Sequence, residues 1–129
     1  MSLDGAFLYA VKNELVPLIG GRVEKIHQPS REEIIISVRT RQGGKKLYIS
    51  TNAGSARIHI TEKNIDNPQT PPMFCMLLRK RIGNGKLLNI RQDGLERILF
   101  LDFVNSQSSH EFHLIYSHHN PLMYYQYLR

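Results

Sequence analysis

The sequence of 129 residues contains one cysteine, no tryptophan and no long apolar run. A single thiol cannot form an internal disulfide, so Cys75 indicates a reducing compartment. No segment approaches the roughly 20 apolar residues that span a bilayer, and no basic stretch with an apolar core opens the chain as an export signal would. We therefore expect a cytoplasmic protein without a membrane segment.

Motifs of enzyme and cofactor chemistry are also missing. The sequence has no glycine-rich phosphate loop, and the run from Gly83 to Lys86 is better explained as a helix stop and a turn. Six histidines raise the question of a metal, but no cysteine pair supports the adjacent His118 and His119. We expect no metal and no cofactor.

The charge balance is basic. Seventeen Lys and Arg against eleven Asp and Glu give a formal charge of +6 and a pI near 9.7. This length suits one domain with its own core. The excess of cations indicates an anionic partner such as nucleic acid, or serves solubility alone.

Apolar periodicity predicts two helices. The first stops at Pro17, and the second has Thr70 as its N-cap and Gly83 just past its end. Their apolar stripes comprise Leu8, Val11 and Leu15 in the first, and Phe74, Leu77, Leu78 and Ile82 in the second.

Alternating apolar residues predict strands between and after these helices, at residues 22–28, 33–39, 46–50, 57–60, 86–92, 97–104 and 111–116. The strand 97–104 is apolar on both faces, which is typical of a central strand. This order predicts an α+β fold, with two antiparallel sheets packed as a sandwich and the helices at its ends or edges.

Residues 74–103 read FCMLLRKRIGNGKLLNIRQDGLERILFLDF, a run that resembles the signature of the N-terminal NFACT domain of bacterial RqcH proteins and their eukaryotic relative NEMF. Further matches lie at residues 3–5, 21–23 and 56–59, so the resemblance covers most of the chain. The positions of the run that fit are Phe74, Met76, Leu78, Arg79, Lys80, Gln92, Glu96 and Arg97.

The resemblance implies a fold similar to the N-terminal domain of formamidopyrimidine-type DNA glycosylases. Those enzymes use an N-terminal proline amine as nucleophile, whereas position two here is Ser2, so we expect a domain that is not an enzyme. A remnant base-excision enzyme is the weakest alternative.

The resemblance also implies a function in ribosome-associated quality control. RqcH-type proteins bind large ribosomal subunits obstructed by peptidyl-tRNA and recruit tRNA, in bacteria alanyl-tRNA, to extend the stalled chain without a template. The pair Glu96 and Arg97 stands where the family carries an acidic residue and an arginine that engage tRNA; the family usually has Asp at the first position. We expect electrostatic support from Arg79, Lys80, Lys86 and Arg91.

Two further groups of cations are candidate phosphate contacts. The hairpin region carries Arg39, Arg41, Lys45 and Lys46 without an acid among them, and Arg57 lies on a nearby strand. Each group of cations can alternatively be explained as a solvated surface. For Glu96 and Arg97 the alternative explanation is a local ion pair. Proteins of this family are often described as fibronectin-binding or fibrinogen-binding, so an adhesin-like interaction module is the alternative function.

The resemblance ends after Tyr116. We therefore divide the chain into an NFACT N-terminal domain at 1–116, which is partial, and a divergent tail at 117–129. The simplest hypothesis is that the sequence is a truncated or frame-shifted piece of a longer protein, or that its end was added in cloning. The tail carries three tyrosines among apolar residues, and we expect it to pack on the body or to form a homodimer.

Overall fold

The computed structural model of the protein describes residues 3–52, 57–64, 70–92, 98–105, 107, 110–117 and 122–128, and for 3–8 and 122–128 the backbone alone. Within these residues, neither helix is long and apolar enough to cross a membrane. The elements in chain order are α1 (Leu3–Leu15), a 3-10 turn (Val16–Leu18), β1 (Arg22–Ser30), β2 (Glu33–Thr40), β3 (Gly43–Ser50), β4 (Arg57–Thr61), α2 (Met73–Ile82), β5 (Lys86–Gln92), β6 (Ile98–Val104), β7 (Glu111–Ser117) and β8 (Leu122–Leu128).

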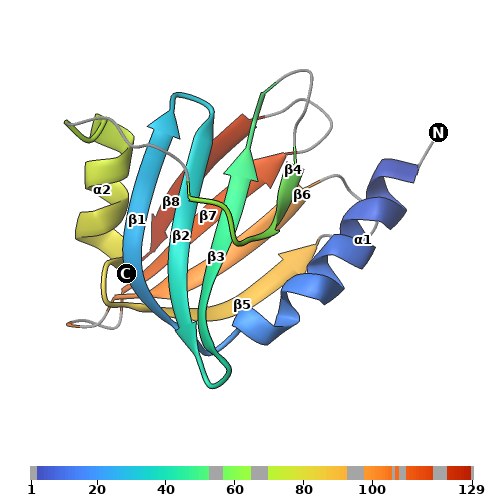
Figure 1. Ribbon diagram of the computed structural model, residues 1–129, viewed down its shortest axis with the longest axis horizontal. Coiled ribbons are helices and arrows are strands. Elements are labelled where there is room, and N and C mark those ends of the chain that lie inside the picture. Colours follow the sequence, from blue (N-terminus) through green and yellow to red (C-terminus); the bar gives the residue numbers. More distant parts are fainter. Residues whose placement is uncertain are drawn as a thin grey trace.

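The strands form one antiparallel sheet in the order β4-β3-β2-β1-β5-β6-β7-β8. β1 and β5 share a single residue pair, Arg22 with Lys86, whereas β2 and β3 pair along their whole length. The sheet therefore turns sharply between β1 and β5, and Figure 1 shows its second half lying behind the first. The predicted α+β sandwich with flanking helices is confirmed, with the difference that its two layers belong to one continuous sheet.

A single apolar core lies between the two halves. The first half contributes alternate residues of β1 to β4, such as Val23, Ile36 and Leu47, and the second half contributes Leu101 and Phe103 among others. All five side chains have no exposed surface. The side chains between them on each strand point away from the core, because successive residues of a strand face opposite sides of the sheet.

Backbone hydrogen bonds hold the two halves at the turn of the sheet. The N–H of Gly20 donates to the Leu87 carbonyl at 2.7 Å, and the N–H of Val23 donates to the Gly85 carbonyl at 2.8 Å. Two bonds run the other way, from Leu87 to Gly21 and from Asn84 to Val23, each at 3.0 Å. We call this contact, residues 20–23 against residues 84–87, the joint.

The two helices fill the openings that the bent sheet leaves. α1 packs against β4, β5 and β6 and buries Val11 and Leu15, while α2 packs against β1. Beyond the joint none of the described strands pairs with β1 on this side, and the carbonyl of Ile26 accepts from side chains of α2 instead. Its donors are the Arg79 Nε at 2.9 Å and the Cys75 thiol at 3.4 Å.

Both predicted helices and all seven predicted strands are present, with three main differences. Pro17 ends α1 at Leu15 as expected, but α2 begins at Met73 and not directly after Thr70. Pro72 is extended, with φ −62° and ψ 160°, and the residue before a proline is disfavoured in the α conformation, so the helix cannot begin earlier. β3 begins at Gly43, ahead of the predicted Lys46. The tail contains a strand, β8, which the sequence analysis did not predict.

Replacing Gly21 tests the joint. A β-carbon there would lie 2.3 Å from the Val38 Cγ1 and 3.0 Å from the carbonyl oxygens of Leu18 and Arg39. We expect Gly21→Ala to lower the free energy of unfolding by about 1–3 kcal/mol, measured by urea denaturation. Gly44→Ala is the control, because its β-carbon would meet no atom within 4 Å. Equal stability of the two variants would contradict the tight packing of the joint.

Candidate nucleic-acid interface

The residues predicted to engage tRNA occupy three separate places. Arg79 and Lys80 lie on α2, while Lys86 and Arg91 lie at opposite ends of β5, about 17 Å apart along the strand. The predicted pair at positions 96 and 97 lies in the connection between β5 and β6, outside the described residues. Arg91 stands closest to that connection along the chain, so the described site is built from β5 and its neighbours.

Arg91 takes part in an ion pair on the outer face of the second half of the sheet. Its Nε donates to the Asp102 Oδ2 at 2.6 Å and its Nη2 to the Oδ1 at 3.0 Å. The Asp102 carboxylate also accepts a hydrogen bond from His113 Nδ1, on the next strand. Asp102 and His113 are both buried, whereas the Arg91 side chain is 47% exposed.

These contacts keep Asp102 charged. Burial alone would raise the pKa of its carboxyl, but the hydrogen bonds from Arg91 and His113 outweigh burial and hold the pKa below its usual value. Both oxygens of the buried carboxylate accept hydrogen bonds from the Arg91 guanidinium. This bidentate geometry holds the guanidinium plane in place. Asp102 and His113 were not predicted from the sequence, because only the strand register brings them beside Arg91.

The guanidinium of Arg91 lies over an aromatic ring. Its Cζ is 4.7 Å from the centre of the Phe100 ring, and the two residues are directly opposite each other in the β5–β6 ladder. An arginine stacked on an aromatic ring is worth about 0.5–1 kcal/mol at an exposed site. Planar guanidinium and aromatic groups are also the surfaces on which unpaired RNA bases stack.

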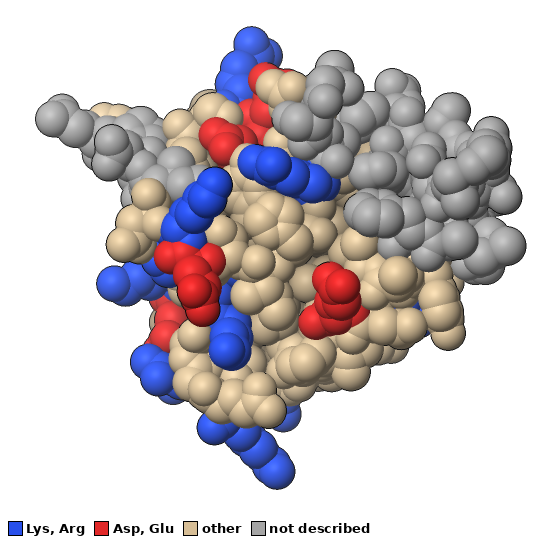
Figure 2. Space-filling model, turned by 45° about the vertical axis from the view of Figure 1, so that its right-hand side comes forward, with Lys and Arg blue, Asp and Glu red and all other residues tan. Residues whose placement is uncertain are grey.

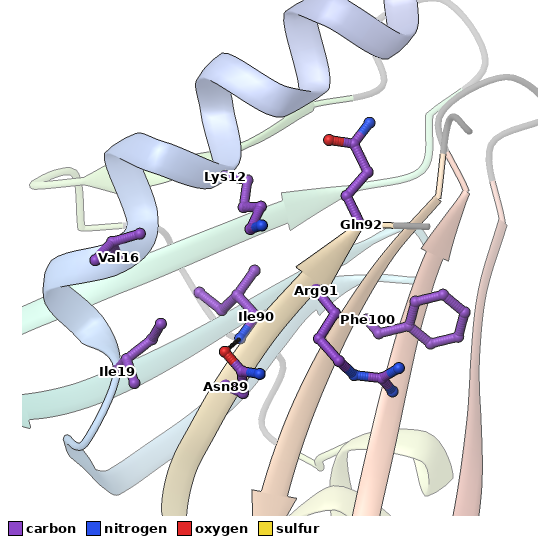
Figure 3. Close-up of a pocket in the computed structure, with 8 residues that line it drawn as sticks. All are labelled: Lys12, Val16, Ile19, Asn89, Ile90, Arg91, Gln92 and Phe100. Carbon is purple, nitrogen blue, oxygen red and sulfur yellow. Dashed lines mark hydrogen bonds between the residues drawn. The ribbon is translucent and has the colours of Figure 1, made fainter. Parts of the chain in front are cut away.

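A groove of about 580 Å³ opens between α1 and β5 beside these residues. Figure 3 shows Lys12 pointing from α1 toward the strand, with Asn89 and Ile90 below it and Arg91 and Phe100 further along the sheet. Gln92 lines the same groove at the end of β5. One ammonium, two amides and a stacked guanidinium are groups that bind phosphate, base edges and base faces respectively.

Arg57 lies on the outer face of the first half. Its guanidinium is 5.2 Å from the centre of the Tyr48 ring, and the His59 ring lies 5.3 Å from Tyr48 on the same side. Arg57 and His59 therefore lie on the same face of β4. The hydroxyl of Tyr48 donates to the carboxylate of Glu33, which completes a polar cluster on this face.

His27 stands among cations on the outer face of β1. Burial, followed by the charges of Arg79, Lys25 and Lys46, lowers the pKa of its imidazole. Lys46 in turn donates to the Asn64 Oδ1 at 2.5 Å. The His27 imidazole is therefore uncharged at neutral pH, while the side chains around it are cations.

The four hairpin cations do not form one cluster. Lys45 pairs with Val38 of the core face and Lys46 with Ser37, so these neighbours point to opposite faces of β3. Arg39 and Arg41 instead line a groove of about 680 Å³ with Lys86 of β5. In Figure 2 blue side chains lie at the lower tip of the molecule, where the β2–β3 hairpin ends, and others lie along the left side and at the top of that face.

Metal and thiol chemistry have no counterpart among the described side chains. No three His, Cys, Asp or Glu side chains of the described residues gather as metal ligands would. Burial raises the pKa of the Cys75 thiol, which has no exposed surface. A thiol of this kind is a poor nucleophile at neutral pH.

The comparison with protein families decides what this domain is. Residues 4–117 match the family described as NFACT N-terminal and middle domains. The chain belongs to this family. The match spans α1 to β7 and leaves out β8.

Curated relatives carry the name that the sequence resemblance suggested. The Rqc2 homolog RqcH of Bacillus subtilis is 45% identical over 100 residues, which are 77% of this chain and 18% of that protein. The Rqc2 homolog RqcH of Streptococcus suis is 38% identical over the same shares, and the archaeal homolog aRqcH of Methanocaldococcus jannaschii is 32% identical over 72% of this chain and 14% of its own. The chain thus spans less than a fifth of the length of these relatives.

Solved structures carry a different name. The N-terminal domain of the fibronectin-binding protein PavA from Streptococcus pneumoniae superposes with a TM-score of 0.87 at 28% identity, over 94% of this chain and 48% of that one. The N-terminal part of the fibronectin/fibrinogen-binding protein of Streptococcus suis gives 0.82 at 32% identity, over 88% of this chain and 44% of its own. Both structures extend well beyond the part that this chain matches.

Removing the Asp102 charge tests the buried ion pair. We expect Asp102→Asn to lower the free energy of unfolding at pH 7 by about 1–3 kcal/mol, because Arg91 loses its partner and the buried hydrogen bonds weaken. The folded pKa of Asp102 is depressed, so its stabilisation is complete above the unfolded value of about 3.9 and is lost as the pH falls through the folded pKa.

Urea denaturation between pH 7 and pH 2.5 checks both statements. The stability of the parent should fall more steeply toward low pH than that of Asp102→Asn. Glu62→Gln is the matched control, since Glu62 is exposed and has no ion pair within the described chain. Parallel pH profiles of the parent and Asp102→Asn would refute the role of the ion pair.

Proposed function

We propose that this domain binds tRNA and the large ribosomal subunit as part of an RqcH-type ribosome-associated quality control factor. In this proposal the factor recognises a subunit obstructed by peptidyl-tRNA and recruits tRNA, which extends the stalled chain with alanine without a template. The domain contributes binding and not catalysis, and it acts in the cytoplasm. Its membership in a family of ribosome quality control factors, with RqcH relatives in four species, supports the proposal.

The observation that carries the proposal is the groove between α1 and β5. Its lining includes Gln92, the last described residue before Glu96 and Arg97 in the sequence, and Arg91 beside it is held over Phe100 by a buried carboxylate. A fixed guanidinium plane loses little conformational entropy when a base stacks nearby. Lys12 on the opposite wall offers a charge for the phosphate backbone, so one groove holds groups for both parts of a nucleotide.

Fibronectin or fibrinogen binding is the second candidate. It rests on the names of the structural neighbours, and those names describe other proteins. Relatives from Streptococcus suis and Streptococcus pneumoniae occur under both names, as RqcH among curated proteins and as fibronectin-binding among structures. The two candidates differ in one measurable respect, because binding to a polyanion depends strongly on salt.

Self-association through the tail stays a prediction. β8 lies at one edge of the sheet and pairs with β7 along its length. Among the described strands none pairs with its other edge, and an open edge is a template for a second copy. Sedimentation equilibrium of the chain would detect a dimer.

Replacing Arg97 tests the tRNA proposal. We expect Arg97→Ala to weaken binding of tRNA about tenfold or more, and to reduce the slope of log affinity against log salt by about 1 if the lost contact is a phosphate. Fluorescence anisotropy with labelled tRNA at several salt concentrations provides the measurement. Arg31→Ala is the control. Arg31 is exposed and lies at the β1–β2 turn, so its replacement should leave tRNA affinity unchanged.

The alternative function predicts a different outcome of the same assay. Binding of the chain to immobilised fibronectin is measured at the same salt concentrations as binding to tRNA. Salt-insensitive binding to fibronectin, together with no affinity for tRNA or large subunits, would overturn the proposal.

A further inference from the structure

Like charges face one another at the joint. In the ladder Arg22 of β1 is paired with Arg39 of β2 on one side and with Lys86 of β5 on the other. Cross-strand partners have their β-carbons about 4.5–5.5 Å apart, and like charges in that position destabilise a sheet. The fold therefore holds three cations in a row across three neighbouring strands at an electrostatic cost.

One carboxylate reduces this repulsion in part. The Oε2 of Glu24 lies 3.4 Å from the Nε of Arg39 and 3.8 Å from the Nη2 of Arg22. The two arginine side chains nevertheless stay 58% and 65% exposed, so solvent screens these pairs. Among the described residues no carboxylate lies within ion-pair distance of Lys86 or Arg41.

The row borders a groove with room for a chain of nucleotides. Arg39, Arg41 and Lys86 line this space of about 680 Å³ together with Gly20 and Gly21, and a β-carbon at Gly20 would meet no atom within 4 Å. Gly20 has φ +91°, a conformation that residues with a β-carbon rarely adopt, so the open wall is built into the backbone. Three exposed cations in one open groove attract an extended polyanion more than a small neutral ligand.

We propose that the groove at the joint binds the phosphodiester backbone of RNA, with Arg41 and Lys86 as its principal phosphate contacts and Arg39 and Arg22 beside them. This inference rests on the proposed RNA-binding function and adds a second contact surface to it, at the end of β5 opposite the groove beside Arg91. The contact reads charge and not sequence, because phosphates carry no base information. An acidic protein segment is the competing occupant.

The test compares two double variants that remove equal charge. Arg41→Gln/Lys86→Gln neutralises the two groove cations that have no carboxylate partner among the described residues, and it leaves the Glu24 pairs intact. Arg31→Gln/Lys63→Gln is the control, since both residues are exposed and lie outside the joint. Circular dichroism and thermal denaturation establish that both variants fold like the parent.

Binding is measured with labelled tRNA and with a labelled RNA duplex that shares no tRNA sequence, at salt concentrations from about 50 to 200 mM. We expect the joint variant to bind both RNAs about tenfold more weakly, with a salt slope lower by about 1–2, and the control to match the parent. Glu24→Gln should tighten binding of both RNAs, because it frees two arginines from their carboxylate. This gain cannot result from misfolding.

Each outcome decides between the joint and the proposed function. Equal losses in the two double variants, or parental RNA binding by the joint variant, would overturn the joint as a site while leaving tRNA binding standing. Polyglutamate that binds the parent but not Arg41→Gln/Lys86→Gln, with RNA affinity unchanged by the same variant, would assign the groove to an acidic protein. Binding of the duplex through the joint, with no preference for tRNA and no association with large subunits, would retain the joint and refute the proposed function.

Discussion

The architecture depends on the four backbone hydrogen bonds of the joint. They fasten residues 20–23 to residues 84–87, while the strands on either side of them diverge. A sheet pinned at one corner can fold over itself and enclose a core, but it leaves two openings. α1 and α2 fill those openings, which explains why the apolar stripe of each helix faces the same core cluster as the strands.

The outer face of the second half is organised by one buried charge. Asp102 accepts hydrogen bonds from Arg91 and His113, so three neighbouring strands share a polar contact on the side away from the core. Burying a carboxylate is costly unless its partners are in place, and replacing such a pair with apolar groups is often neutral for stability. The buried ion pair therefore explains the fixed orientation of Arg91 over Phe100 better than it explains the stability of the fold.

The sequence predicted the elements more reliably than the site. Apolar alternation located the strands because half-buried strands repeat every two residues, and Pro17 and Gly83 stopped the helices where such residues usually do. The start of α2 depended on the geometry of consecutive prolines. β8 was missed because the resemblance stopped before the tail, and its side chains were assigned to packing alone.

The partners of the cations could not be predicted in the same way. The sequence spacing of Arg91, Asp102 and His113 does not indicate a contact, because the register of three strands alone brings them together. Arg22 was seen as part of a family motif and not as a charge between two others. Register, and the bend that places β1 beside β5, decide which cations become neighbours.

The contact between Cys75 and the Ile26 carbonyl gives the fold a built-in chemical reporter. The thiol has no exposed surface and a raised pKa, so an alkylating reagent reaches it only when α2 leaves β1. As the single cysteine of the chain, it allows the labelling rate to measure the opening of this edge separately from global unfolding. Helix docking thereby becomes observable in the unmodified sequence, without the introduction of a probe.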